Sequence, residues 1–336
     1  MLARKLQGSK SAAGFYSGNI AVAHSGSPYI SVYPWSQGFG TKYSNPATLP
    51  TGEGRSVKFS PDGASLAVGH STSPYISVYP WAAGFGTKYS NPSTLPANDG
   101  NGVAFSPNGA SIAVAHATSP FITAYPWSAG FGTKYANPAT LPSGIGNAVT
   151  FSPNNSTIVV AGVTSPRIHA YPWNPGFGTK YANPASLPST VNGVAFNPNG
   201  NTIVVAMTSG SYMKAWQWSA GFGTAYSDPA TTLPGAGNGV VFSPDGQYVA
   251  FAHSSSPYIS AYPWSAGFGT KIADPSTLPA GEGFGIAFTP DGANVAIAHA
   301  TSPYITVYTW SAGFGTKYSD PATLPAGAGL AVAFSP

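Results

Sequence analysis

A motif written YPWSQGFGTKYSNPATLP at its first occurrence, from Tyr33 to Pro50, recurs along the whole of this 336-residue chain. Its core GFGT begins at positions 38, 84, 130, 176, 221, 267 and 313, so successive copies lie 46, 46, 46, 45, 46 and 46 residues apart. A fixed period of this size is typical of repeat architectures, in which each repeat is one supersecondary unit. We therefore expect one domain over residues 17–336, preceded by an N-terminal tail of residues 1–16 that serves as a tether.

One repeat contains four short apolar segments separated by turn signals. From position 101 the chain reads NGVAF, SPNG, SIAVAH, TSP, FITAYPW, SAG and FGTKY, followed by a proline-rich connector. Alternating large and small residues predict strands, and Gly, Pro and Asn in fixed places predict the turns between them. Each repeat is thus expected to form four antiparallel strands, and seven such repeats predict an all-β, seven-bladed β-propeller.

Segments of the repeat also resemble a known class of propeller. FSPDG at 59–63 and 242–246, LAVGH at 66–70 and YISVYPW at 75–81 are similar to WD40 and YVTN repeats. The chain lacks the Gly-His and Trp-Asp dipeptides of true WD40 repeats, so their His–Asp hydrogen-bond network is not expected here. The resemblance implies that the ring closes by pairing the C-terminal strand, within 330–336, with the N-terminal blade, since each end holds only part of a blade.

Histidines recur at the end of the second predicted strand of most repeats. They are His24, His70, His116, His253 and His299. Neighbouring blades lie too far apart at this radius for two imidazoles to share one metal ion, so no metal site is expected. Hydrogen bonding to a turn is the favoured interpretation, with contact to a ligand or partner as the alternative.

Lysine follows GFGT in six of the seven copies and is spread around the predicted rim. A nucleic-acid-binding protein concentrates its basic residues on one face, so we expect no nucleic-acid partner. We interpret these lysines as protection of edge strands, with binding of an anionic partner as the alternative. The recurring Tyr, Trp and Phe residues favour packing between blades, with stacking on sugars or a protein interface as the alternatives.

Catalytic groups are sparse. The nine acidic residues are scattered, several of them in PDG turns or before proline, and no paired carboxylates, Ser-His-Asp set or phosphate loop is evident. We therefore expect a protein that is not an enzyme and carries no cofactor.

Two adjacent repeats depart from the others and are the expected place for an asymmetric binding site. The fourth copy introduces Arg167 and His169, and the fifth introduces Tyr212, Lys214 and Trp216. Neutral drift in a redundant repeat is the alternative interpretation.

The repeated YPWSxGFGTKYxNPxxLP units also resemble repeat proteins encoded by tailed bacteriophages. That resemblance implies a non-enzymatic virion component, either a capsid decoration or a tail or fibre adhesin that contacts glycans. Its partners would be other virion proteins or a host surface glycan or protein, and its location the virion. The alternative is a cellular WD40-like protein–protein interaction scaffold in the cytoplasm. No apolar run is long enough for a signal or membrane segment, so membrane insertion is not expected.

Overall fold

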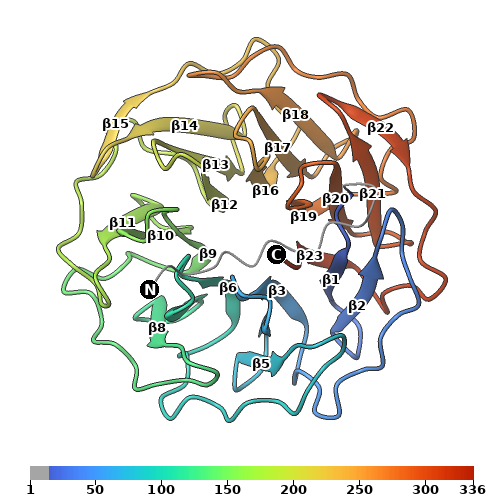
Figure 1. Cartoon of the computed structure of the whole chain (residues 1–336). Helices are drawn as coiled ribbons and strands as arrows, with labels where there is room; N and C mark the ends of the chain where they lie inside the picture. The colour runs from blue at the N-terminus through green and yellow to red at the C-terminus, as the bar shows by residue number, and fades with distance from the viewer. Residues whose placement is uncertain (1–14) are drawn as a thin grey trace, which may run out of the picture.

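Seven antiparallel sheets stand around a central axis in the computed structural model, which describes residues 15–336 (Figure 1). The predicted seven-bladed propeller is confirmed. The predicted tail lies outside the described residues except for Phe15 and Tyr16. Within residues 15–336, no helix is both long and apolar enough to cross a membrane.

Each blade presents its first strand to the axis and its later strands progressively further out (Figure 1). The inner strands are β23 (Gly329–Phe334), β3 (Gly54–Phe59), β6 (Gly100–Phe105), β9 (Gly146–Phe151), β12 (Val191–Phe196), β16 (Gly237–Phe242) and β19 (Gly283–Phe288). The middle strands are β1 (Gly18–His24), β4 (Ser65–His70), β7 (Ser111–His116), β10 (Thr157–Gly162), β13 (Thr202–Met207), β17 (Tyr248–His253) and β20 (Asn294–His299). The third strands are β2 (Ile30–Trp35), β5 (Ile76–Pro80), β8 (Ile122–Pro126), β11 (Ile168–Pro172), β14 (Met213–Trp218), β18 (Ile259–Pro263) and β21 (Ile305–Trp310).

The predicted fourth strand forms fully in two of the described blades, as β15 (Phe222–Ala225) and β22 (Phe314–Lys317). In the other five blades a single antiparallel bridge joins the Trp and Phe of the motif. The reason is visible in the third strand: these five blades carry proline before the tryptophan, whereas the four-stranded blades carry Gln217 and Thr309. Proline has no backbone N–H to donate to a further strand, so the ladder stops after one bridge.

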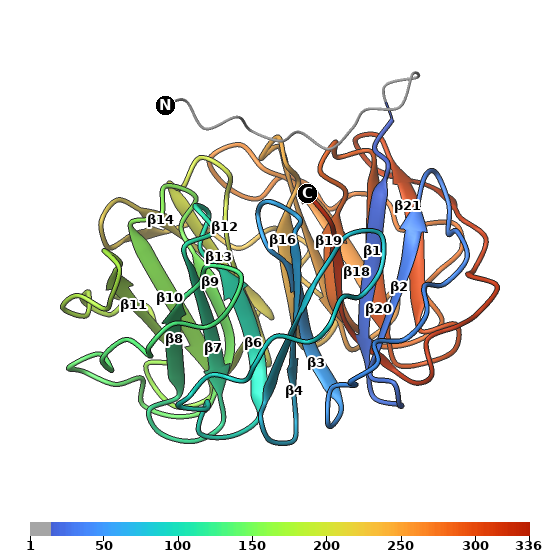
Figure 2. The ribbon, with the colours of Figure 1, turned by 60° about the horizontal axis from the view of Figure 1, so that its bottom comes forward.

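The ring closes by pairing the two ends of the chain. Strand β1 lies between β2 and β23, with Ile20 opposite Phe334. Beyond the strands, the Tyr16 hydroxyl donates to the carbonyl oxygen of Ser335 at 2.7 Å. The expected pairing of the C-terminal strand with the N-terminal blade is thereby confirmed, and Figure 2 shows β1 and β2 beside the last blade.

The core lies between adjacent blades, where the aromatic residues of the repeat meet. Trp81 packs edge-to-face against Phe59 and Phe85 of its own blade and against Tyr43 of the preceding repeat, with the Tyr43 ring centroid 5.2 Å away. The same cluster recurs around the ring. Such edge-to-face pairs contribute beyond the area they bury, so the repeated motif mainly joins each blade to the next.

Candidate functional site

A β-bulge near the start of every inner strand directs one side chain per blade towards the axis. In β3, for example, Gly54 pairs with His70 and Ser56 with Gly69, which leaves Arg55 as the extra residue. The same shift occurs in all seven blades. The bulged residues are Arg55, Asn101, Asn147, Asn192, Asn238, Phe284 and Leu330. Bulges commonly re-aim a side chain towards a functional site, and here they build a ring at one mouth of the axial channel.

The polar members of this ring form hydrogen bonds from blade to blade. Arg55 Nη1 donates to Asn101 Oδ1 at 2.8 Å, and Asn192 Nδ2 donates to Asn238 Oδ1 at 3.3 Å. Each Asn side chain also donates to a backbone carbonyl of the next inner strand, as Asn147 does to Val191 at 3.0 Å. The amides are therefore held in fixed orientations around the mouth.

Three carboxylates stand beside this ring. Arg55 Nη1 lies 2.8 Å from Asp99, and Arg55 Nε lies 3.6 Å from Glu53. On another blade, Glu282 accepts a hydrogen bond of 2.9 Å from Asn238 Nδ2. The Arg55 and Glu53 side chains are 33% and 40% exposed, so both remain accessible to a ligand.

The mouth encloses a recess of about 350 Å³ lined by Glu53, Arg55, the four asparagines, Phe284 and Leu330. Ligand pockets generally begin at about this size. One side of the recess is charged and amidic, and the other is apolar. Among the described residues, no group of three His, Cys, Asp or Glu side chains is arranged to hold a metal ion.

The five predicted histidines lie at the same end of the ring but are fully buried within the blades. Each places Nε2 against a hydroxyl of the third strand: His70 lies 3.1 Å from Ser77 Oγ, and His116 lies 2.8 Å from Thr123 Oγ1. Burial lowers the pKa of each of these histidines to about 4, so they are neutral at pH 7. A role of these residues in binding stays a prediction.

In the fourth repeat the imidazole has moved to the neighbouring strand. Gly162 stands where five of the other blades have histidine, and His169 stands where those five have serine or threonine. His169 Nε2 accepts a hydrogen bond of 3.2 Å from the backbone N–H of Ser143, and burial lowers its pKa to about 4. The blade interior therefore keeps one imidazole. The loss of histidine at position 162 is compensated by its gain at position 169.

The other predicted residues of the fourth and fifth repeats do not meet at the axial mouth. Arg167 Nη1 donates to the carbonyl of Pro188 at 3.0 Å. Trp216 is fully buried and lines a rim recess with Phe222 and Ala225. Tyr212 and Lys214 are half-buried on that blade. Their role in binding also stays a prediction.

The rim lysines have a local function in the structure. Lys88 Nζ, for example, donates to the Tyr89 carbonyl at 3.2 Å and to Asn91. Where aspartate replaces this asparagine, as at Asp320, an ion pair forms with Lys317. These contacts fasten the start of each connector to the rim.

Sequence analysis missed the axial ring, Glu53, Asp99 and Glu282. A signal for it was present: aligning the repeats on the glycine that opens each inner strand shows Arg, four Asn, Phe and Leu at the following position. A position that varies in chemistry within otherwise similar repeats marks a place where the blades differ in function.

Comparisons with known proteins support the fold. By sequence, no family model and no curated protein matches the chain. A solved protein from Lactobacillus plantarum is similar with a TM-score of 0.76 at 14% identity, over 95% of this chain and 99% of that one. The periplasmic gluconolactonase PpgL of Pseudomonas aeruginosa is similar with a TM-score of 0.74 at 15% identity, over 96% and 99%. A protein described as a candidate 6-phosphogluconolactonase from Bacteroides uniformis gives 0.71 at 17% identity, over 95% and 99%.

These likenesses support the propeller fold of the chain. They overturn the expected role as a virion component or as a protein–protein scaffold, because the neighbours above that carry a functional name are named as lactonases, which are enzymes. The expectation that the chain is not an enzyme is not confirmed. The resemblance to WD40 and YVTN repeats, the expected partners and the expected location stay predictions.

Proposed function

We propose that the Arg55 mouth binds a small polyhydroxylated lactone of the sugar-acid class and hydrolyses its ring ester. The observation that carries this proposal is the Arg55 guanidinium, held between Asp99 and Glu53 at the edge of a concave ring of amides. Two solved proteins of similar fold are named as lactonases, and this analogy of fold favours the same substrate class.

The ring suits a ligand rich in hydroxyl groups. Asparagine side chains offer both a donor and an acceptor, and carboxylates accept hydrogen bonds from hydroxyls. Phe284 and Leu330 provide an apolar wall for the C–H face of a sugar ring. A site with several fixed polar groups and one apolar wall orients a small ligand in one direction.

The charged groups supply the chemistry that ester hydrolysis needs. Glu53 would act as general base: a water proton passes to its carboxylate while the water oxygen bonds to the lactone carbonyl carbon. Arg55 would stabilise the negative charge that develops on the carbonyl oxygen. The ring C–O bond then breaks, the departing alkoxide takes the proton from Glu53, and the open-chain acid is released.

The test compares the intact chain with three variants on glucono-1,5-lactone, using a pH indicator to follow acid release above the spontaneous rate. We expect acceleration by the wild type and a loss of at least about 100-fold in Arg55→Met and Glu53→Gln, typical of removing an electrostatic stabiliser or a general base. Lys88→Met, at the rim, should retain full activity.

Binding is measured separately by NMR titration with gluconate. Saturable shifts of the asparagine side-chain amides without acceleration of hydrolysis would reject the reaction and keep the binding site. Absence of both, or equal activity in Arg55→Met, would reject the mouth as the functional site.

A further inference from the structure

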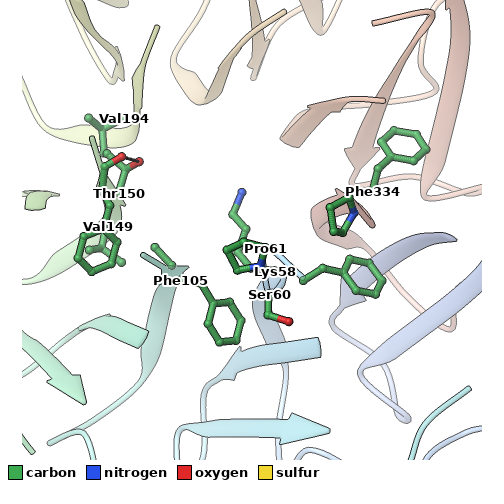
Figure 3. Close-up of a pocket in the computed structure, with 12 residues that line it drawn as sticks. Lys58, Ser60, Pro61, Phe105, Val149, Thr150, Val194 and Phe334 are labelled. Carbon is green, nitrogen blue, oxygen red and sulfur yellow. Dashed lines mark hydrogen bonds between the residues drawn. The ribbon is translucent and has the colours of Figure 1, made fainter. Parts of the chain in front are cut away.

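A lone lysine projects into the lumen towards the opposite end of the channel. Lys58 lies on β3, and Figure 3 shows its side chain pointing into the open space between the inner strands. The hollow around it has a volume of about 340 Å³. Phe334 and Pro336, at the end of β23, line it, and Lys58 also borders the part of the channel that leads to the Arg55 mouth.

Lys58 breaks the seven-fold pattern of the lumen. The six equivalent positions of the other inner strands hold Ala104, Thr150, Ala195, Val241, Ala287 and Ala333. All six are small or uncharged, so one blade alone places a cation in this wall. The fold of the repeat does not require lysine at this position, because four blades have alanine there.

Apolar side chains and polar groups share the walls around Lys58. Pro61, Val149 and Val194 line the hollow, together with Phe105 and Phe334, whose rings point away from it and pack against tryptophans (Figure 3). Of the residues that line it, none is acidic. Desolvation by these walls lowers the pKa of Lys58 from its ordinary value.

The ammonium group has no internal counter-charge. Throughout the described part of the chain, the ion pairs of lysine and arginine involve Arg55, Lys271 and Lys317, and none involves Lys58. Asp62, three residues beyond the end of β3, instead accepts hydrogen bonds from Ser60 and from the backbone of Ala64 within its own turn. Because Lys58 is exposed to the lumen, its ammonium group is accessible to an anion that enters the channel.

We propose that Lys58 and its hollow form a binding site for a small organic monocarboxylate with an apolar body. One lysine matches one carboxylate, through a charge-assisted hydrogen bond. The valine and proline side chains match an aromatic or branched aliphatic body. Inorganic phosphate, which carries more charge and no apolar part, fits this surface less well.

The test uses NMR titration of the full-length, isotope-labelled chain with benzoate at pH 7. We expect saturable shifts for residues of β3, β6 and β9 near the hollow. Lys58→Ala, which copies four of the other blades, should weaken binding at least about tenfold while the thermal midpoint stays unchanged. Lys58→Arg should retain most of the affinity, and Lys88→Met, a rim lysine, should leave it unchanged.

Two further probes test the ligand class. Benzyl alcohol, which has a similar shape but no charge, should bind at least about tenfold more weakly than benzoate, and phosphate should also bind more weakly. Equal binding by Lys58→Ala, equal binding of benzyl alcohol, tighter binding of phosphate, or no saturable shift with benzoate would each overturn the proposal. Lys58 and the Arg55 mouth border one channel. Benzoate binding is therefore also measured in Arg55→Met, where it should be unchanged, which separates this outcome from the lactone assay.

Discussion

The Arg55 guanidinium lies 2.8 Å from the carboxylate of Asp99, which belongs to the next repeat along the chain. This ion pair joins two blades at the axial mouth, yet its side chains are 33% and 26% exposed. Partly exposed ion pairs contribute about 1 kcal/mol or less to stability. The pair is therefore better suited to orienting a ligand-binding group than to holding the ring together.

Replacing Arg55 with methionine should accordingly separate binding from stability. We expect Arg55→Met to lower the free energy of unfolding by about 1 kcal/mol or less in urea titration, while affinity for gluconate falls at least about tenfold. Lys88→Met, at the rim, serves as the control for removal of a positive charge. A loss of stability above about 2 kcal/mol would show that Arg55 is mainly structural.

Tyr125 and Tyr262 occupy equivalent places on β8 and β18 but differ in their hydrogen bonds. The Tyr125 hydroxyl donates to the carbonyl of Thr94 at 2.7 Å, whereas the buried Tyr262 hydroxyl has no partner among the described residues. Between Pro229 and Leu233 the connector before Tyr262 has three residues, Ala230, Thr231 and Thr232, where the other connectors have two. This extra residue displaces the carbonyl that would accept the bond.

The two tyrosines therefore make a matched pair for mutation. Tyr125→Phe should lower the free energy of unfolding by about 1 kcal/mol, because the hydrogen bond to the Thr94 carbonyl is lost. Tyr262→Phe should be neutral or stabilising by up to about 1 kcal/mol, because it removes an unsatisfied buried hydroxyl. Chemical denaturation of both variants gives the comparison, and equal losses would mean that ordered water satisfies Tyr262.

Much of this fold could be predicted from the sequence because its information is periodic. The spacing of GFGT determined the number of blades, and the incomplete repeats at the two ends predicted the closure by β1 and β23. The number of strands per blade could not be read as easily. The number of strands depends on the residue before the tryptophan, which is proline in five blades and Gln217 or Thr309 in the other two. That residue affects pairing only because the third strand is the one to which a fourth strand would be added.

The candidate site was harder to predict, since it depends on a bulge. In a regular strand the alternation of side chains does not reveal that Arg55 is an extra residue directed at the axis. The seven bulged positions come together only when the ring closes, and carboxylates that are far apart in sequence, such as Asp99 and Glu282, then border one mouth. The recurring histidines were the more evident candidates in the sequence, but in the structure they are buried.

Closure of the ring predicts an effect of changes at both termini. Tyr16 is buried, and its hydroxyl donates to Ser335, so Tyr16→Phe should lower the free energy of unfolding by about 1 kcal/mol. Deleting residues 330–336 removes most of β23 and exposes an edge of β1. We therefore expect this variant to lose cooperative unfolding and to aggregate. Circular dichroism melts and light scattering measure both outcomes. An unchanged melt after the deletion would contradict the observed pairing of β1 with β23.

Six buried histidines predict a strong dependence of stability on acid pH. Burial lowers the pKa of His24, His70, His116, His169, His253 and His299 from 6.5 to about 4. Between these values the unfolded chain binds more protons than the folded chain, so stability is full above pH 6.5 and falls as the pH decreases towards 4. At pH 4 each histidine then lowers the free energy of unfolding by up to about 3 kcal/mol. The six losses together exceed the roughly 5–15 kcal/mol by which a typical domain is stable.

We therefore expect acid unfolding between pH 4 and 6, measured by circular dichroism across that range. His116→Gln removes one titrating group from the blade formed by β6, β7 and β8. It should reduce the slope of unfolding free energy against pH by at most about 1.4 kcal/mol per pH unit, the value for one proton. Lys88→Met should leave the slope unchanged. Stability that stays constant from pH 7 to 4.5 would mean that the imidazoles gain protons inside the folded blades, against the burial and hydrogen bonding that hold them neutral.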